Sequence, residues 1–200
     1  AVLEATIDQL GAGARWLVGC GSLPPGMDDS FYAELVRRAR YAGARVAIDT
    51  SGSPLTVAVT AWPDLIKPNL EELEDLVGET LSTLGDVRDA AATLAESGIG
   101  TVVVSLGRHG ALLVSATQVA HAQATVAKPL STVGAGDSLL AGFLHAISRG
   151  TAAPEALANG AAWGGAAVSL PGSRMPTPGE VAAIPVSLTT TPDFTLHVTD

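Results

Sequence analysis

The sequence is poor in cysteine, in aromatic residues and in positive charge. Its single cysteine, Cys20, excludes an internal disulfide and cannot build a zinc site by itself, which is typical of a reducing compartment. Because Cys20 falls in an apolar run, we expect it to serve packing rather than chemistry. Lys and Arg number 11 against 20 Asp and Glu, giving a net charge of −9. With no basic stripe, a nucleic-acid or anionic-membrane partner is not expected.

No apolar run has the length of a membrane span, and no signal peptide is visible, so we expect a cytoplasmic protein. The chain does have 47% hydrophobic residues over 200 positions, enough to bury the core of one globular domain. It begins without Met and within a helical pattern, Val2–Leu10, which predicts a piece of a longer protein. We assign residues 1–184 to the domain and residues 185–200 to a polar tail.

Short apolar runs bounded by glycine or proline alternate with helical patterns along the chain. This alternation predicts an α/β fold with a mostly parallel central sheet covered by helices on both faces. The predicted strands are Arg15–Gly21 (a buried one), Arg45–Asp49, Asp64–Lys67, Thr101–Leu106, Ala111–Val114 and an edge strand at Val119–Val126. The predicted helices cover residues 30–41, 55–61, 70–77, 87–97, 139–147 and 154–170, with a helical turn at 179–183.

Four polar loops follow predicted strands: residues 22–26, 49–52, 67–69 and 105–110. Ligands of parallel α/β proteins bind at the carboxyl ends of the strands. We therefore expect these loops to line one rim.

A glycine-rich stretch, Ser131–Ser138, precedes a predicted buried helix. Its two glycines and an alanine let backbone N–H groups approach a ligand, and a helix N-terminus favours an anion. Asp137 falls in the first turn, where it can accept a proton from a nearby hydroxyl. The arrangement indicates phosphoryl transfer to an alcohol. On spacing alone, a glycine turn with an Asp near a helix start is an open alternative.

Asn69 and Glu72 lie three residues apart on the first turn of a predicted helix, and so on one face. They are either an N-cap with a first-turn acid or groups that organise water around Mg²⁺. Lys67 is either a surface lysine or a phosphate contact. The pattern Ser105-x-Gly107-x-x-Gly110 is either a hairpin turn or a backbone loop that approaches a nucleotide phosphate.

Several other chemistries are not indicated. The chain has no dinucleotide-binding G-x-G-x-x-G and no P-loop. Its four histidines show no metal-ligand spacing. Ser22 and Ser138 lack the G-x-S-x-G context of a hydrolase nucleophile.

These motifs together resemble the phosphofructokinase-B (ribokinase-like) family of carbohydrate kinases, in its phosphosugar-kinase branch. Ser131–Ser138 resembles the family's C-terminal signature. Four further motifs occur in the family's order: Gly21–Gly26, Asp49–Gly52, Lys67–Glu72 and Ser105–Gly110. With residues 166–174 included, the resemblance extends to about residue 184. It implies a three-layer α/β/α ribokinase-like fold from which the family's N-terminal third and its lid are absent.

The resemblance also implies roles for matching positions. Asp137 is implied as the general base, with Gly134, Ala135 and Gly136 forming the anion hole for the transferring phosphoryl group. Ser22 is implied to touch the substrate.

For cofactors, the resemblance implies ATP and Mg²⁺. Asn69 and Glu72 are implied to position Mg²⁺ and phosphate through water. ATP is implied to contact Lys67, Ser105, Leu106, Gly107, Arg108, His109 and Gly110, with room for adenine at Ala161 and Gly165. Main-chain oxygens at Ser131, Val133, Ala167, Leu170 and Gly172, with Arg174 alongside, resemble a monovalent-cation (K⁺) site.

The implied reaction transfers the γ-phosphate of ATP to a hydroxyl of a phosphorylated sugar, with fructose 1-phosphate as the favoured acceptor. Tagatose 6-phosphate and fructose 6-phosphate are alternative acceptors, because those branches share the motifs. A nucleotide-binding remnant without turnover is the alternative from a different class. The resemblance is compatible with a homodimer and does not require one.

Overall fold

The computed structural model describes residues 13–199, so the predicted helix Val2–Leu10 lies outside the described residues. The chain divides into two compact units. Of the described residues, the first unit comprises 13–104, Val114–Thr117 and 195–199; the second comprises Ser105–Leu113 and Gln118–Phe194.

The first unit is built on parallel strands, as predicted. β1 (Trp16–Cys20) pairs with β2 (Arg45–Asp49), β2 with β3 (Leu65–Ile66), and β3 with β4 (Thr101–Ser105). The register places Cys20 opposite Asp49, so β1 and β2 end at the same level. The loops after β1, β2 and β3 therefore leave the sheet from one edge.

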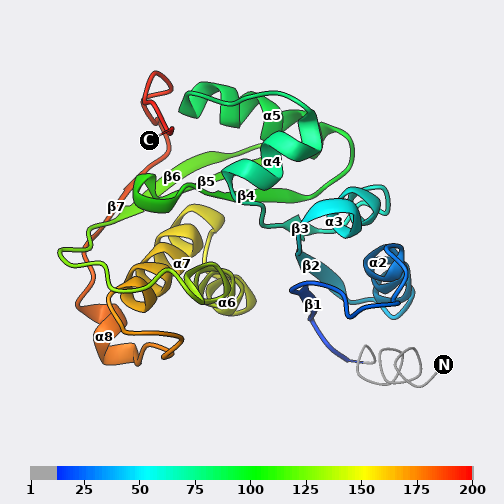
Figure 1. The fold of residues 1–200 in the computed structure, drawn as a ribbon, viewed down its shortest axis with the longest axis horizontal. Helices are drawn as coiled ribbons and strands as arrows, with labels where there is room; N and C mark the ends of the chain where they lie inside the picture. Colours follow the sequence, from blue (N-terminus) through cyan, green and yellow to red (C-terminus); the bar gives the residue numbers. More distant parts are fainter. Residues whose placement is uncertain (1–12, 200) are drawn as a thin grey trace. The chain divides into compact units, whose positions relative to one another are not determined.

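Helices alternate with these strands. They are α2 (Phe31–Tyr41), α3 (Gly52–Val59), α4 (Leu70–Val77) and α5 (Leu84–Glu96). The apolar positions of α2 recur at helical spacing, and Tyr32, Leu35, Val36 and Ala39 are buried. This face packs against β1, β2 and α3 (Figure 1).

The second unit contains the turn η1 (Gly107–His109) and the strands β6 (Val119–Ala124) and β7 (Val186–Thr189). Strand β5 (Ala111–Ser115) belongs to this unit up to Leu113 and to the first unit from Val114. Its helices are α6 (Ala135–Ser148), α7 (Ala153–Val168) and the short α8 (Pro178–Ala182). α6 and α7 lie side by side (Figure 1). They approach closely because glycines face the contact: a Cβ on Gly160 would lie 2.8 Å from the carbonyl oxygen of Leu139. Phe143 of α6 and Leu157 of α7 are both buried.

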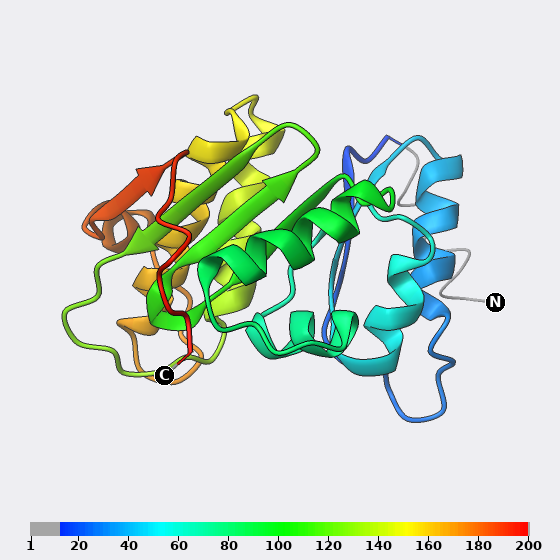
Figure 2. The same cartoon turned by 90° about the horizontal axis from the view of Figure 1, so that it is seen from above.

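Two expectations differ from the structure. β1 is not a buried strand, because Val18 is 46% exposed and Cys20 is exposed. The expected packing role of Cys20 is therefore wrong. Residues 186–189, assigned to a polar tail, form β7 and pair antiparallel with β6 (Figure 2). The domain boundary at residue 184 stays a prediction.

Within residues 13–199, no helix combines the length and the hydropathy that a membrane crossing requires.

Candidate active site

Gly21, directly after β1, joins the strand ends of the first unit through hydrogen bonds. Its N–H donates to the carbonyl oxygen of Asp49 at 2.8 Å. Its own carbonyl oxygen accepts from the hydroxyls of Thr50 at 2.9 Å and Tyr32 at 2.8 Å. Tyr32 also contacts the carbonyl oxygen of Cys20 at 3.0 Å. Ser22, the predicted substrate contact, is exposed next to this fixed point.

Lys67, directly after β3, is buried and paired. Its ammonium lies 3.0 Å from Oδ1 of Asp49, and the two side chains are 6% and 14% exposed. Its N–H donates to the carbonyl oxygen of Ile48, which fixes the backbone beside β2. The alternative of a surface lysine is therefore wrong. A buried ammonium needs a compensating charge, and Asp49 supplies it.

Asn69 and Glu72 begin α4 as a capping box. The N–H of Glu72 donates to Oδ1 of Asn69 at 2.8 Å, and the N–H of Asn69 donates to Oε2 of Glu72 at 2.9 Å. The capping alternative is thus confirmed. Capping leaves the carboxylate of Glu72 able to bind a further group, because the capping box engages only one of its oxygens and the side chain is half-buried. The role toward Mg²⁺ stays a prediction.

In the second unit, Gly134 is the N-cap of α6, with φ of 77° and no side-chain capping hydrogen bond. This left-handed conformation favours glycine. Among the described side chains none caps this end of the 14-residue helix, and the N–H of Ala135 donates to the carbonyl oxygen of Thr132 at 3.2 Å. Ala135 and Gly136 are half-buried there, and Asp137 is exposed in the first turn. An uncapped helix N-terminus beside an exposed carboxylate suits an anion and a hydroxyl proton.

The loop before Gly134 lies against the end of α7. The N–H groups of Leu130 and Ser131 both donate to the carbonyl oxygen of Val168, at 2.8 and 3.3 Å. The carbonyl oxygen of Ala167 accepts from the N–H of Leu170 at 3.0 Å. The structure thus brings Ser131 to the part of the chain that carries Ala167 and Leu170, three of the positions predicted for a monovalent cation.

The remaining positions of that group lie in exposed loops. Val133 is 61% exposed, and its N–H donates to Oγ of Ser131. Gly172 has φ of 63°, and Arg174 pairs with Glu180 at 2.7 Å. Arg174 is therefore held by a carboxylate.

The predicted nucleotide loop, Ser105–Gly110, is a tight turn. The N–H of Leu106 donates to the carbonyl oxygen of Gly110 at 2.8 Å. The N–H of His109 donates to the carbonyl oxygen of Leu106 at 3.0 Å. Gly107 and Arg108 are exposed at its tip. Gly110 has φ of 86°, and a Cβ there would collide with the carbonyl oxygen of Ala122 in β6. Its glycine is thus required by the close approach of two backbones.

Ala161 and Gly165 lie one turn apart on α7, and both are buried. A Cβ on Gly165 would lie 2.7 Å from Cβ of Ala124 and 3.1 Å from Cγ2 of Ile184. The small residue is therefore needed for packing α7 against β6. The predicted room for adenine stays a prediction.

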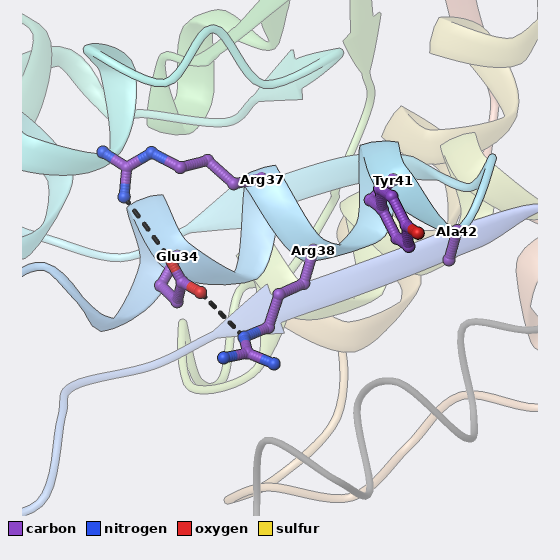
Figure 3. Close-up of a pocket in the computed structure, with 5 residues that line it drawn as sticks. All are labelled: Glu34, Arg37, Arg38, Tyr41 and Ala42. Atoms are coloured by element: carbon purple, nitrogen blue, oxygen red, sulfur yellow. Dashed lines mark hydrogen bonds and ion pairs between the residues drawn. The ribbon is translucent and has the colours of Figure 1, made fainter.

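A hollow of about 620 Å³ lies along α2 in the first unit (Figure 3). In Figure 3 the carboxylate of Glu34 lies between Arg37 and Arg38, with ion pairs of 3.4 and 2.8 Å. Tyr41 and Ala42 complete the described lining. Among these lining residues none was predicted for the site, so the hollow is not the candidate active site.

Sequence reasoning gave no role to three residues that organise the rim of the first unit. Asp49 and Thr50 belong to the motif Asp49–Gly52, and their position at the end of a strand indicates a place in the site. Tyr32 gave no signal, because it falls on the apolar stripe of a helix. Only the fold brings its hydroxyl to Gly21.

Comparison with known proteins identifies the family. The family model described as pfkB family carbohydrate kinase matches residues 5–179. The chain therefore belongs to the pfkB family of carbohydrate kinases. It is 42% identical to 1-phosphofructokinase of Rhodobacter capsulatus over 94% of this chain and 60% of that protein. It is 37% identical to ATP-dependent 6-phosphofructokinase isozyme 2 of Escherichia coli over 86% of this chain and 56% of that protein.

Solved structures confirm the fold class. Phosphofructokinase-2 of Escherichia coli in complex with potassium superposes with a TM-score of 0.85 at 35% identity, over 90% of this chain and 59% of that one. The predicted α/β, ribokinase-like class and the family resemblance are thus confirmed. The chain spans about 60% of the length of its curated relative from Rhodobacter capsulatus.

Proposed function

We propose that this chain supplies the phosphoryl-transfer part of an ATP-dependent phosphosugar kinase, with fructose 1-phosphate as the acceptor. The observation that carries the proposal is Asp137, exposed in the first turn of α6 next to an uncapped helix N-terminus. The relative from Rhodobacter capsulatus, named 1-phosphofructokinase, supports this acceptor over fructose 6-phosphate and tagatose 6-phosphate.

In this proposal Asp137 accepts the proton of the sugar hydroxyl that attacks phosphorus. The N–H groups at Gly134, Ala135 and Gly136 would stabilise the negative charge that develops on the phosphoryl group, and the helix dipole adds to their effect. Gly134 already holds the left-handed turn, and Ala135 would exchange its hydrogen bond to the carbonyl oxygen of Thr132 for one to the phosphoryl group. The two elements together bind an anion and remove a proton at one helix end.

The residues assigned to ATP and Mg²⁺ suit those groups chemically. Mg²⁺ takes oxygen ligands and retains water, and Glu72 offers the carboxylate oxygen that the capping box does not engage. Lys67 offers an ammonium for phosphate, and the nucleotide loop offers its exposed tip at Gly107 and Arg108. When bound, ATP with Mg²⁺ supplies the transferable phosphoryl group. The carbonyl groups near Ser131 and Ala167 are the oxygen donors that a K⁺ ion would take.

A coupled ADP-release assay across fructose 1-phosphate, fructose 6-phosphate and tagatose 6-phosphate tests the proposal, run beside calorimetric titration of ATP. Preferred turnover of fructose 1-phosphate is expected. Preferred turnover of another sugar contradicts the substrate assignment alone. ATP binding without turnover of any sugar favours a nucleotide-binding remnant.

The proposal places the protein in the cytoplasm and includes a homodimer as its assembly. Sedimentation velocity with and without ATP measures that assembly directly, and a single species of monomer mass at micromolar concentration contradicts it.

A further inference from the structure

We infer that His121 and Gln123 of β6 are positioning residues that anchor the nucleotide loop and so set the affinity for ATP. The inference rests on the proposed function only in naming ATP. The anchor itself is a property of the second unit.

The two side chains bind consecutive carbonyl groups of the loop. Nε2 of His121 lies 2.6 Å from the carbonyl oxygen of His109. Nε2 of Gln123 donates to the carbonyl oxygen of Arg108 at 2.8 Å. Positions two apart on a strand point to the same face. One face of β6 therefore binds the carbonyl groups of two successive loop residues, Arg108 and His109.

The main chain between them completes the contact. Ala122 meets Gly110 so closely that a Cβ on that glycine would collide with its carbonyl oxygen. Three consecutive residues of β6 therefore contact the loop at Arg108, His109 and Gly110. A tip held at three successive residues has little freedom left.

The chemistry fixes which atoms carry hydrogen. A carbonyl oxygen only accepts, so Nε2 of His121 must bear a proton to make this bond. His121 is 8% exposed, and its ring is held in place by the packing around β6. Within the turn, the N–H groups of His109 and Gly110 are already used by Leu106 and Gly107. Fixing the two carbonyl groups therefore fixes the orientation of the whole tip, including its exposed face.

This arrangement explains a polar pair in an otherwise apolar strand. Ala120, Ala122 and His121 are buried, and a buried polar ring is retained only where it has a partner. Since ATP is proposed to contact residues 105–110, the anchor pre-organises a binding loop and lowers the ordering cost of binding.

The test uses the full chain with His121→Phe and Gln123→Leu, which remove the donors and keep similar volume. His121→Gln restores a terminal N–H donor and serves as the rescue variant. Ser187→Ala is the matched control, because its hydroxyl donates to the main-chain oxygen of Gln123 and does not touch the loop. Hydrogen exchange of residues 105–113 is measured without nucleotide, and ATP affinity by calorimetry.

Loss of either donor is expected to raise exchange in the loop and weaken ATP binding about 3- to 10-fold, the range for one net hydrogen bond. In the turnover assay KM for ATP should rise while kcat changes less than about 2-fold. The rescue variant should recover much of the affinity. Unchanged loop exchange, or raised exchange with unchanged ATP affinity, overturns the inference.

A wild-type chain that binds no ATP contradicts the proposed function and, with it, the link to affinity. Loop exchange then still decides the anchor: equal exchange in Ser187→Ala and Gln123→Leu overturns it.

Discussion

The ammonium of Lys67 lies 3.0 Å from the carboxylate of Asp49, and the two residues come from the ends of neighbouring parallel strands. Breaking a buried pair by removing one partner leaves a charge without compensation. We expect Lys67→Met to lower the free energy of unfolding by about 3 kcal/mol in urea titration. The double variant with Asp49→Asn should lose less than the sum of the single variants.

The more exposed pair Arg88–Asp89 provides the control for that measurement, because its side chains are 34% and 70% exposed. Arg88→Met should cost less than about 1 kcal/mol. Equal losses for Lys67→Met and Arg88→Met would show that the buried position of the first pair has no energetic consequence.

Asp137→Asn is expected to lower turnover by about 10²- to 10⁴-fold while ATP binding is largely kept, because the amide cannot accept the hydroxyl proton. ADP release and calorimetric ATP titration measure the two effects separately. Glu155→Gln removes a carboxylate from the first turn of α7 and should leave turnover unchanged. Near-normal turnover in Asp137→Asn would remove the residue from the role of base.

Three glycine substitutions should follow a definite order of destabilisation. Gly110→Ala is expected to cost the most, because it adds a backbone collision to a positive φ. Gly134→Ala should cost about 1–2 kcal/mol, because a left-handed residue at φ of 77° gains a Cβ in otherwise ordinary contact. Gly179→Ala, in open space, should be neutral or slightly stabilising. Thermal unfolding gives the order, and a different order contradicts the glycine assignments.

Tyr32 gives a prediction for alkaline pH. Burial raises the pKa of its phenol above the ordinary value of 10.0. A raised pKa means that the folded state holds the proton more tightly than the unfolded chain. The stabilisation is therefore complete below about pH 10 and is lost as pH rises through the raised pKa. Tyr32→Phe should flatten this alkaline decline and cost about 1 kcal/mol at neutral pH through the lost hydrogen bonds.

Tyr41→Phe is the control for that titration, because Tyr41 is 97% exposed. Its stability curve against pH should follow that of the wild type. An alkaline decline that is identical in Tyr32→Phe and the wild type would assign the effect to other groups.

Glu72→Gln separates capping from metal binding. Gln can replace Glu at the third position of a capping box, so the melting temperature should change little. The proposed role toward Mg²⁺ needs the carboxylate charge, so the Mg²⁺ concentration for half-maximal turnover should rise several-fold. Asp86→Asn, in the equivalent box of α5, should leave that concentration unchanged. An unchanged Mg²⁺ requirement in Glu72→Gln would leave Glu72 with a capping role alone.

The sequence predicted most of the first unit because its signals are local. Short apolar runs flanked by glycine predicted β1 and β2. Asn69 and Glu72 predicted the start of α4 to within one residue. The glycine-rich stretch Ser131–Ser138 was also predictable, because Gly134 favours a turn with positive φ and the apolar run after it indicates a helix.

The missed features depend on contacts between segments distant in sequence. β7 is four residues long and has no buried residue, so it forms through pairing with β6 rather than through its own pattern. The same holds for the hydroxyl of Tyr32 on Gly21 and for the burial of Lys67. The packing of Gly165 against Ala124 of β6 and Ile184 is likewise a contact between distant segments.

β7 also matters for handling the protein. It pairs with β6 from His121 opposite Thr189 to Ala124 opposite Val186. Cutting the chain after residue 184 would leave that row of N–H and C=O groups open to pairing with another molecule. The exposed edge would then be a nucleus for aggregation, so the residues with the least apparent pattern protect the solubility of the protein.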